Sequence, residues 1–209
     1  MPIQKNILHQ TRIVFTALDF EELTAELIRK SIHFLIALSP LMAAVNRSFT
    51  VALLITGIIT YACLEKLRLG GRSVPLISFL TAAASRRRDR NRFVLGPVTL
   101  GLGALLALLF YPSPAASIAV YALAFGDGFA SLVGKFFGRI RPPLLLGKSL
   151  EGSLACFTAV FIAAHGVSGR ITVAAFAGFI AALTEALPLE DYDNIVLPLT
   201  VGFMVQLVF

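Results

Sequence analysis

Long runs of apolar residues, separated by shorter polar links, divide the chain into segments. Within these runs the apolar positions are consecutive and do not alternate with polar ones, which predicts helices rather than the strands of a membrane barrel. Several runs approach the roughly 20 residues that a helix needs to cross a bilayer. We therefore predict an all-α integral membrane protein, a polytopic bundle of about seven transmembrane helices. The predicted spans cover residues 27–45, 49–64, 93–111, 116 onward, 152–165, 171–187 and 195–209.

The polar segments complete this division. Residues 1–25 mix charged and apolar positions, which predicts an N-terminal amphipathic or flexible segment ahead of one transmembrane domain over residues 26–209. The apolar piece at 74–84 is too short to span a bilayer, so we predict an interfacial or re-entrant segment there. An arginine-rich run at 86–92 follows it, and is typical of an anchor on the positive side of a membrane.

Composition supports the membrane class. The 209 residues are 57% hydrophobic and 14% charged, with a mean hydropathy of +0.83, whereas a soluble domain carries about 25% charged residues. In a membrane protein the net charge of +6 indicates topology and anionic lipid rather than nucleic acid. Cys63 and Cys156 both fall in apolar segments without metal-site spacing, so we expect small buried side chains there.

The distribution of basic residues predicts an orientation. Basic residues gather before the first predicted span, between the second and third, and between the fourth and fifth, whereas the opposite links hold only Arg47 and Arg170. By the positive-inside rule the basic side is cytoplasmic, which places the N-terminus there. The acidic link at 190–194 falls on the same side although topology does not require it. This convergence of both charge signs predicts an active site on the cytoplasmic face.

The stretch from Phe125 to Ser153 concentrates the candidate chemistry. If it is helical, Asp127, Ser131, Gly134 and Gly138 share one face, and several cations follow as the chain leaves the membrane. Charged residues within a span face the bundle interior and have partners. For Asp127 and for Glu185 in the sixth span, a structural salt bridge or a metal site are both open. Mg²⁺ takes one or two carboxylates together with phosphate oxygens and water, and Asp127, Glu185 and Asp193 are candidates.

Two soluble nucleotide motifs are excluded. Gly147-Lys148-Ser149 resembles the end of a phosphate-binding loop, but Pro142 stands where that motif requires its first glycine, and no strand precedes it. The Gly126-x-Gly128 pair also lacks a preceding strand and a third glycine.

Three pieces of the sequence resemble the CTP-dependent lipid-alcohol kinases, the family of dolichol kinase, phytol and farnesol kinases and the CTP-using diacylglycerol kinase. Residues 26–33, ELIRKSIH, resemble its E-L-x-R-K-x-x-H segment. Residues 127–138 resemble its D-x-x-A-S-x-x-G-K-x-x-G segment, and 148–153, KSLEGS, its K-[ST]-x-E-G-[ST] segment. A weaker fourth match is Glu185 followed by Asp193-Asn194 and Pro198. The match extends in order from Glu26 to the C-terminus.

The resemblance implies that CTP, with Mg²⁺, donates its γ-phosphate to the hydroxyl of a membrane lipid alcohol, such as a polyprenol, a phytol-like isoprenoid or diacylglycerol. The implied partners are that lipid, the nucleotide and the bilayer, with no nucleic acid. It implies catalytic roles for Asp127, Lys135, Lys148 and Glu151 and metal binding by Asp127, Glu185 and Asp193. The residues implied to bind the nucleotide or complete its pocket are Arg29, Lys30, His33, Ser131, Gly134, Gly138, Ser149, Gly152, Ser153 and Asn194.

Two rival functions stay open from the sequence. Phosphatidate cytidylyltransferases share a distant form of the second and third pieces, although their fuller basic and aspartate-rich signature near the C-terminus is missing here. A small membrane transporter would also use intramembrane acids, but the polar residues gather at one face and none lines the opposite half of the predicted bundle. The identity of the alcohol depends on the shape of apolar grooves that the sequence pattern does not specify.

Overall fold

The computed structural model describes residues 23–72, 74–75, 81, 92–145 and 147–209. Every regular element among these residues is helical, which confirms the predicted all-α fold. Most of the predicted N-terminal segment, most of the apolar piece at 74–84 and the arginine run up to residue 91 lie outside the described residues.

The described helices follow one another along the chain, with the longest interval between α2 and α4. An N-terminal helix over residues 23–35 leads through a turn into α2, and α5 continues through a π-helix, η2, into α6. The bounds are α2 Leu38–Leu69, α4 Gly96–Phe110, α5 Ala115–Tyr121, η2 Ala122–Asp127, α6 Gly128–Phe136, the 3-10 helix η3 Pro143–Leu145, α7 Leu150–Ser168, α8 Ile171–Glu185 and α9 Asp193–Val208.

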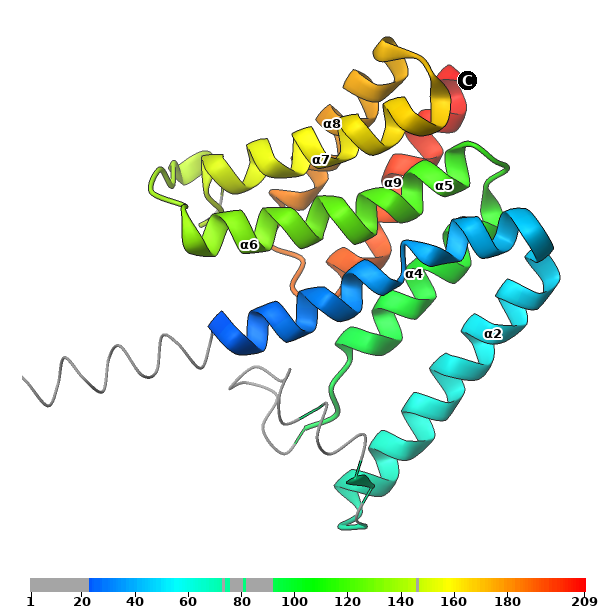
Figure 1. The fold of residues 1–209 in the computed structure, drawn as a ribbon. Helices are drawn as coiled ribbons and strands as arrows, with labels where there is room; N and C mark the ends of the chain where they lie inside the picture. The colour runs from blue at the N-terminus through cyan, green and yellow to red at the C-terminus, as the bar shows by residue number, and fades with distance from the viewer. Residues whose placement is uncertain (1–22, 73, 76–80, 82–91, 146) are drawn as a thin grey trace, which may run out of the picture.

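Asn46 turns the chain back on itself within α2. Its φ of −152° and ψ of 99° are extended rather than helical. The Asn46 side-chain oxygen accepts a hydrogen bond from the Phe49 N–H at 3.0 Å, which caps the helix that follows. The Arg47 guanidinium donates to the Leu108 carbonyl near the end of α4. The turn predicted between the first two spans is therefore confirmed, and the rest of α2, called the α2 arm here, runs beside α4, where Ile58 lies against Gly101 (Figure 1).

Small residues let the helices of the bundle approach closely. The rod formed by α5, η2 and α6 lies at its centre, with α7 packed along it and α9 against α4, α5 and α8 (Figure 1). Ala119, Ala164 and Ala177 are fully buried between these helices. At Gly103 in α4, an added Cβ would collide with the Asn194 carbonyl of α9. Backbone contacts of this kind, which side chains larger than glycine would prevent, are typical of membrane helix packing.

Three helical stretches are long and apolar enough to cross a membrane, namely Leu23–Leu69, Ala115–Phe136 and Leu150–Ser168. The first has 47 residues and is the stretch that Asn46 interrupts. Three more apolar helices, α4, α8 and α9, are shorter, at 15 or 16 residues. Large apolar side chains such as Phe49, Ile162 and Phe179 lie more than half exposed on outer faces, as a surface in contact with lipid would have. The membrane class is thus supported, and the count of seven spans stays a prediction.

Candidate active site

A π-helical turn sets the position of Asp127. In η2 the backbone hydrogen bonds run from i to i+5, so the turn holds one residue more than an α-helical turn, and such turns are frequent at functional sites. Asp127, the last residue of η2, is buried and accepts a hydrogen bond from Lys30 Nζ at 2.5 Å. His33 Nδ1 lies 3.2 Å from the same carboxylate oxygen. The structure thus brings together three predicted site residues from the N-terminal helix and the central rod.

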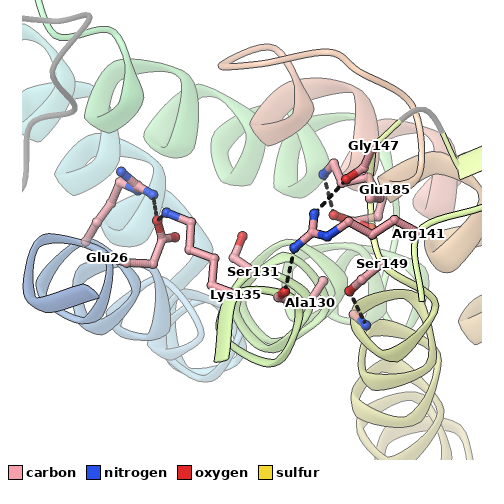
Figure 2. Close-up of a pocket in the computed structure, with 12 residues that line it drawn as sticks. Glu26, Ala130, Ser131, Lys135, Arg141, Gly147, Ser149 and Glu185 are labelled. Atoms are coloured by element: carbon pink, nitrogen blue, oxygen red, sulfur yellow. Dashed lines mark hydrogen bonds and ion pairs between the residues drawn. The ribbon is translucent and has the colours of Figure 1, made fainter. Parts of the chain in front are cut away.

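A polar pocket of about 270 Å³ lies along α6 at the end of the bundle where α6 finishes and α7 begins. Five segments contribute to it: the N-terminal helix, α6, the link into α7, the first turn of α7 and the end of α8. Figure 2 shows Glu26 and Lys135 at one end of the pocket, Ser131 and Ala130 between, and Arg141, Gly147 and Glu185 at the other. The lining comprises Glu26, Arg29, Ala130, Ser131, Gly134, Lys135, Arg141, Gly147, Lys148, Ser149, Gly152 and Glu185.

One end of the pocket is built around Glu26. Its carboxylate is 1% exposed, and its Oε2 atom accepts hydrogen bonds from both Arg29 and Lys135. Arg29 lies one helical turn further on the same helix, whereas Lys135 comes from α6. Two of the predicted ligand-binding cations therefore share one buried carboxylate.

The other end of the pocket is built around Lys148, which forms an ion pair with Glu185 at the end of α8. Burial acts to lower the pKa of Lys148, but the neighbouring Glu185 carboxylate outweighs it and raises that pKa above its ordinary value, so the amine stays charged. Arg141 donates to the carbonyls of Gly147 at 2.8 Å and Gly134 at 3.1 Å, which ties the link between α6 and α7 to α6.

The first turn of α7 closes this end. The Ser149 hydroxyl caps the helix by accepting the Gly152 N–H at 3.1 Å, which leaves the hydroxyl proton free to be donated elsewhere. A Cβ on Gly152 would lie 2.8 Å from the Ala130 carbonyl and 3.3 Å from the Gly134 Cα. The glycines therefore let α6 and α7 meet backbone to backbone at the pocket.

Gly138 lies outside the helix that the sequence analysis assigned to it. α6 ends at Phe136, with Phe137 at its C-terminal cap in a non-helical conformation. An added Cβ at Gly138 would still collide with the Gly134 carbonyl and lie 2.6 Å from Ser149 Oγ. The prediction of one continuous helix to Gly138 is wrong in this last turn, and the glycine contributes instead to the close packing of the link that follows.

Several predicted site residues do not line the pocket. The Glu151 carboxylate accepts the backbone N–H groups of Arg139 at 3.0 Å and Ile140 at 3.1 Å, and so holds the link between α6 and α7. Asn194 donates to Thr99 Oγ1 at 2.9 Å and joins α9 to α4. Asp127, Lys30 and His33 form the separate cluster described above, and Ser153 and Asp193 are also absent from the lining.

The carboxylates suit a metal ion only when phosphate completes its coordination. Within the described part of the chain, no group of three or more His, Cys, Asp and Glu side chains could hold a metal ion. Mg²⁺ in nucleotide enzymes uses one or two carboxylates, with phosphate oxygens and water as the other ligands. Glu185 lines the pocket and can serve in that way, whereas Asp193 accepts the neighbouring Asn194 N–H at 2.8 Å. The residues therefore fit a magnesium ion that arrives with a nucleotide.

Sequence reasoning gave no site role to two of the charged residues that line the pocket. Glu26 appeared as a motif residue, as a helix partner of Lys30 and among the charges on the predicted cytoplasmic face, and Arg141 as one of several cations that follow the fourth span. Glu26 contacts Lys135, which is 109 residues away in the sequence, and Arg141 donates to a backbone carbonyl. Neither contact is visible in the local sequence pattern. The spacing of Glu26 and Arg29 on one helix face was the signal that could have indicated a buried ion pair.

Comparison with known proteins identifies relatives that are kinases of lipid alcohols. The chain is 30% identical to the probable phytol kinase 1, chloroplastic, of Glycine max over 152 residues, which is 64% of this chain and 50% of the relative. It is 31% identical to the farnesol kinase, chloroplastic, of Arabidopsis thaliana over 133 residues, covering 56% of this chain and 43% of the relative. It is 28% identical to the CTP-dependent diacylglycerol kinase 1 of Eremothecium gossypii over 126 residues, covering 60% and 37%.

These relatives confirm the resemblance to the lipid-alcohol kinases that the motifs indicated. The chain spans about half the length, or less, of the curated relatives it matches. No family model matches the chain, and no solved structure matches it.

Proposed function

We propose that this chain is a CTP-dependent lipid-alcohol kinase, which transfers the γ-phosphate of CTP to the hydroxyl of a membrane lipid alcohol. The observation that carries the proposal is the pocket between α6 and α7, because four basic side chains line it: Arg29, Lys135, Arg141 and Lys148. Three segments that resemble those of lipid-alcohol kinases supply most of its lining, and the relatives named above are kinases of phytol, farnesol and diacylglycerol.

The charge arrangement supports a phosphate-binding role. Lys135 is paired with Glu26 and Lys148 with Glu185, so the pocket supplies counter-ions to its own cations. A triphosphate carries enough negative charge to compete for these cations, and its oxygens accept hydrogen bonds in several directions. The volume of about 270 Å³ lies at the low end of ligand pockets. It suits a phosphate chain, with cytidine and the lipid extending beyond it.

The proposed reaction is a direct phosphoryl transfer. The lipid hydroxyl oxygen forms a bond to the γ-phosphorus of CTP, the bond from that phosphorus to the oxygen shared with the β-phosphate breaks, and CDP leaves. Catalysis of this step rests mainly on positioning and on stabilising charge that spreads over the phosphate oxygens. We assign that stabilisation to Lys148, Lys135 and Arg29, with Ser149 donating a further hydrogen bond.

Magnesium completes the proposed site. Asp127, Glu185 and Asp193 are the carboxylates that we propose to hold Mg²⁺, directly or through water, and the ion would neutralise phosphate charge. Glu185 lines the pocket, and Asp127 lies one helical turn from Ser131 of the lining. Lys30 and His33, which contact Asp127, would then hold its carboxylate in place. Glu151 would act by fixing the link that carries Lys148.

The membrane arrangement that we propose has seven spans with the pocket on the cytoplasmic side. A lipid alcohol presents its hydroxyl at headgroup depth, and the pocket is built from the ends of helices rather than from their middles. The basic links on that side of the predicted bundle agree with the positive-inside rule. A polyprenol, a phytol-like isoprenoid and diacylglycerol all meet this requirement.

Label transfer tests the function. Membranes containing the expressed chain and Mg²⁺ would receive a panel of lipid alcohols with CTP labelled at the γ-phosphate, CTP labelled at the α-phosphate, or γ-labelled ATP. We expect lipid label from γ-labelled CTP alone. Label from α-labelled CTP would instead indicate a cytidylyltransferase that forms a CDP-lipid. Absence of label from every donor, with folded protein verified, would contradict the proposal and favour the transporter.

A further inference from the structure

Glu26 is the carboxylate of the pocket lining that has a buried oxygen without a hydrogen-bond partner among the described residues. Its Oε2 atom accepts from Arg29 and Lys135, as described above. Its Oε1 atom is buried and, among the residues that the structure describes, has no hydrogen-bond partner. The side chain as a whole is only 1% exposed, and it lines the pocket.

An unpaired oxygen of this kind is unusual. Buried polar atoms in proteins nearly always have a hydrogen-bond partner, because a buried carboxylate oxygen that has lost water without replacing it is costly. The Glu26 carboxylate is already held by two cations on its other oxygen, so it is oriented and charged before any ligand arrives. Oε1 is therefore placed to accept a hydrogen bond from a group that enters the pocket.

The position of Glu26 restricts what that group is. The opposite end of the pocket can hold an anion, because it has Lys148 and the Ser149 hydroxyl, and its one carboxylate, Glu185, is paired with Lys148. Phosphate oxygens cannot donate a hydrogen bond to a carboxylate and would be repelled by it. Lys135 and Arg29, beside Glu26, can contact the terminal phosphate from the other side. A donor at Oε1 is thus placed next to the phosphorus that would be transferred.

We infer that Glu26 Oε1 accepts the hydrogen bond of the lipid hydroxyl and takes its proton during transfer. This inference rests on the proposed function. As the hydroxyl oxygen bonds to the γ-phosphorus and CDP departs, the O–H proton passes to Oε1, and it is released to water before the next cycle. Asp127, which the motif resemblance suggested as a possible base, is held by Lys30 and lies outside the pocket lining.

Glu65 supplies a matched control. Like Glu26, it is a buried glutamate on the long N-terminal helical stretch, paired with an arginine three residues later. Both of its oxygens are used, however: Arg68 donates to each at 2.7 Å, and the Val94 N–H donates to Oε1 at 3.1 Å. It lies outside the pocket lining. Replacing either glutamate by glutamine removes the same charge, but only one change alters the pocket.

The experiment compares Glu26→Gln, Glu65→Gln and the unchanged protein in detergent or vesicles. CTP affinity is measured by equilibrium binding, and kcat and KM for the alcohol by transfer of γ-label. For Glu26→Gln we expect kcat to fall about 100-fold or more, the usual loss on removing a proton acceptor. CTP should bind at least as tightly as before, because Lys135 and Arg29 lose a competing carboxylate. Glu65→Gln should retain the normal kcat per folded molecule.

Glu26→Asp covers the case in which the glutamine variant does not fold. Aspartate keeps the charge and the cation pairing but withdraws the carboxylate by one methylene, so kcat should fall at least tenfold while CTP affinity is kept. Normal kcat in either Glu26 variant would overturn the inference. Weakened CTP binding in step with lost transfer would also overturn it, because Glu26 would then serve the nucleotide. Absence of transfer by the unchanged protein contradicts the proposed function itself, which distinguishes the two failures.

Discussion

Long-range pairs between lysines and carboxylates dominate the site at the scale of single residues. Lys30 reaches Asp127 across 97 residues, Lys135 reaches Glu26 across 109, and Lys148 reaches Glu185 across 37. In an apolar bundle, removing one member of such a pair leaves a buried charge, which is more damaging than removing both. Breaking any one of these pairs should therefore be destabilising, and two of them, Lys135–Glu26 and Lys148–Glu185, involve cations that we propose to bind phosphate.

Asp127→Asn should abolish phosphoryl transfer. The change removes a proposed magnesium ligand and the charge that holds Lys30, while keeping the shape of the side chain. The measurement is transfer of γ-label from CTP, with the folded state checked by monodispersity on size exclusion. Glu190→Gln, which removes an exposed carboxylate from the link before α9, should leave transfer unchanged. Near-normal activity of Asp127→Asn would contradict the assignment of Asp127 to the active site.

Lys148→Met should lower kcat/KM for CTP by about 100-fold to 1,000-fold, the usual loss when one preorganised hydrogen-bond donor to the transition state is removed. It also leaves Glu185 buried without its partner. Lys148→Arg keeps the charge and should restore part of the activity. Adding Glu185→Gln to Lys148→Met should recover stability in a thermal unfolding assay but not activity. Recovery of both by the double change would mean that the pair is purely structural.

The sequence could identify many of these residues but not their partners. Asp127 stood out because a carboxylate is costly within an apolar segment, and Lys148 and Ser149 stood out within a polar loop. Where the side chains of Glu151 and Asn194 point is determined by tertiary contacts. Glu151 accepts a backbone N–H of the link after α6, and Asn194 donates to Thr99 of α4. Lys135, 109 residues away, contacts one oxygen of Glu26 and not the other. No local sequence pattern predicts that contact.

The contact between α6 and α7 is the feature that shapes the pocket at the scale of elements. Gly152 allows it, because α7 passes so close to the Ala130 carbonyl that a methyl group has no space. Overpacking of this type costs about 1–3 kcal/mol. The separation of α6 and α7 therefore determines both stability and the distance between Lys148 and the residues of α6.

Gly152→Ala should lower the free energy of unfolding by about 1–3 kcal/mol and also raise KM for CTP. Gly166→Ala is the matched control, since Gly166 lies on the same helix with nothing within 4 Å of an added Cβ. There alanine should be neutral or stabilise by about 0.5–1 kcal/mol. Thermal unfolding in detergent and CTP titration measure both effects. Equal behaviour of the two variants would show that the contact does not constrain the pocket.

Hydropathy predicted the helices well because each is mostly apolar and bounded by polar or glycine-rich links. The turn at Asn46 was predicted for the same reason and is confirmed by its backbone angles. The end of α6 was placed too late, since Phe137 and Gly138 continue the apolar and glycine spacing without continuing the helix. The π-helix η2 was missed because its sequence, ALAFGD, has no signature that distinguishes it from an α-helical segment.

The whole molecule has a polar end and an apolar body. The pocket cations gather where α6 ends and α7 begins, whereas the exposed surface of the α2 arm and of α7 is rich in large apolar side chains. Length and hydropathy support three membrane-crossing stretches. The apolar helices α4, α8 and α9, at 15 or 16 residues, fall just short of the roughly 17–25 residues of a membrane-crossing helix.

Cysteine labelling tests the proposed orientation. In a background with Cys63→Ser and Cys156→Ala, one cysteine would replace Arg139 in the link between α6 and α7, and another Ser113 between α4 and α5. An impermeant maleimide should label the first only from the cytoplasmic side and the second only from the opposite side. Labelling of both from the same side would contradict the seven-span arrangement.

The extra residue in the turn Ala122–Asp127 acts as a phase shift along one uninterrupted rod. Before it, Ile118, Ala119 and Val120 are buried in the core; after it, Ser131 and Lys135 line the pocket. Each residue of an α-helix turns the next by about 100°. Deleting Leu123 would therefore rotate α6 by about that angle relative to α5 and carry its polar side chains away from their partners. The added residue therefore lets the α5 part of the rod direct its side chains into the core, while the α6 part directs Ser131 and Lys135 into the pocket.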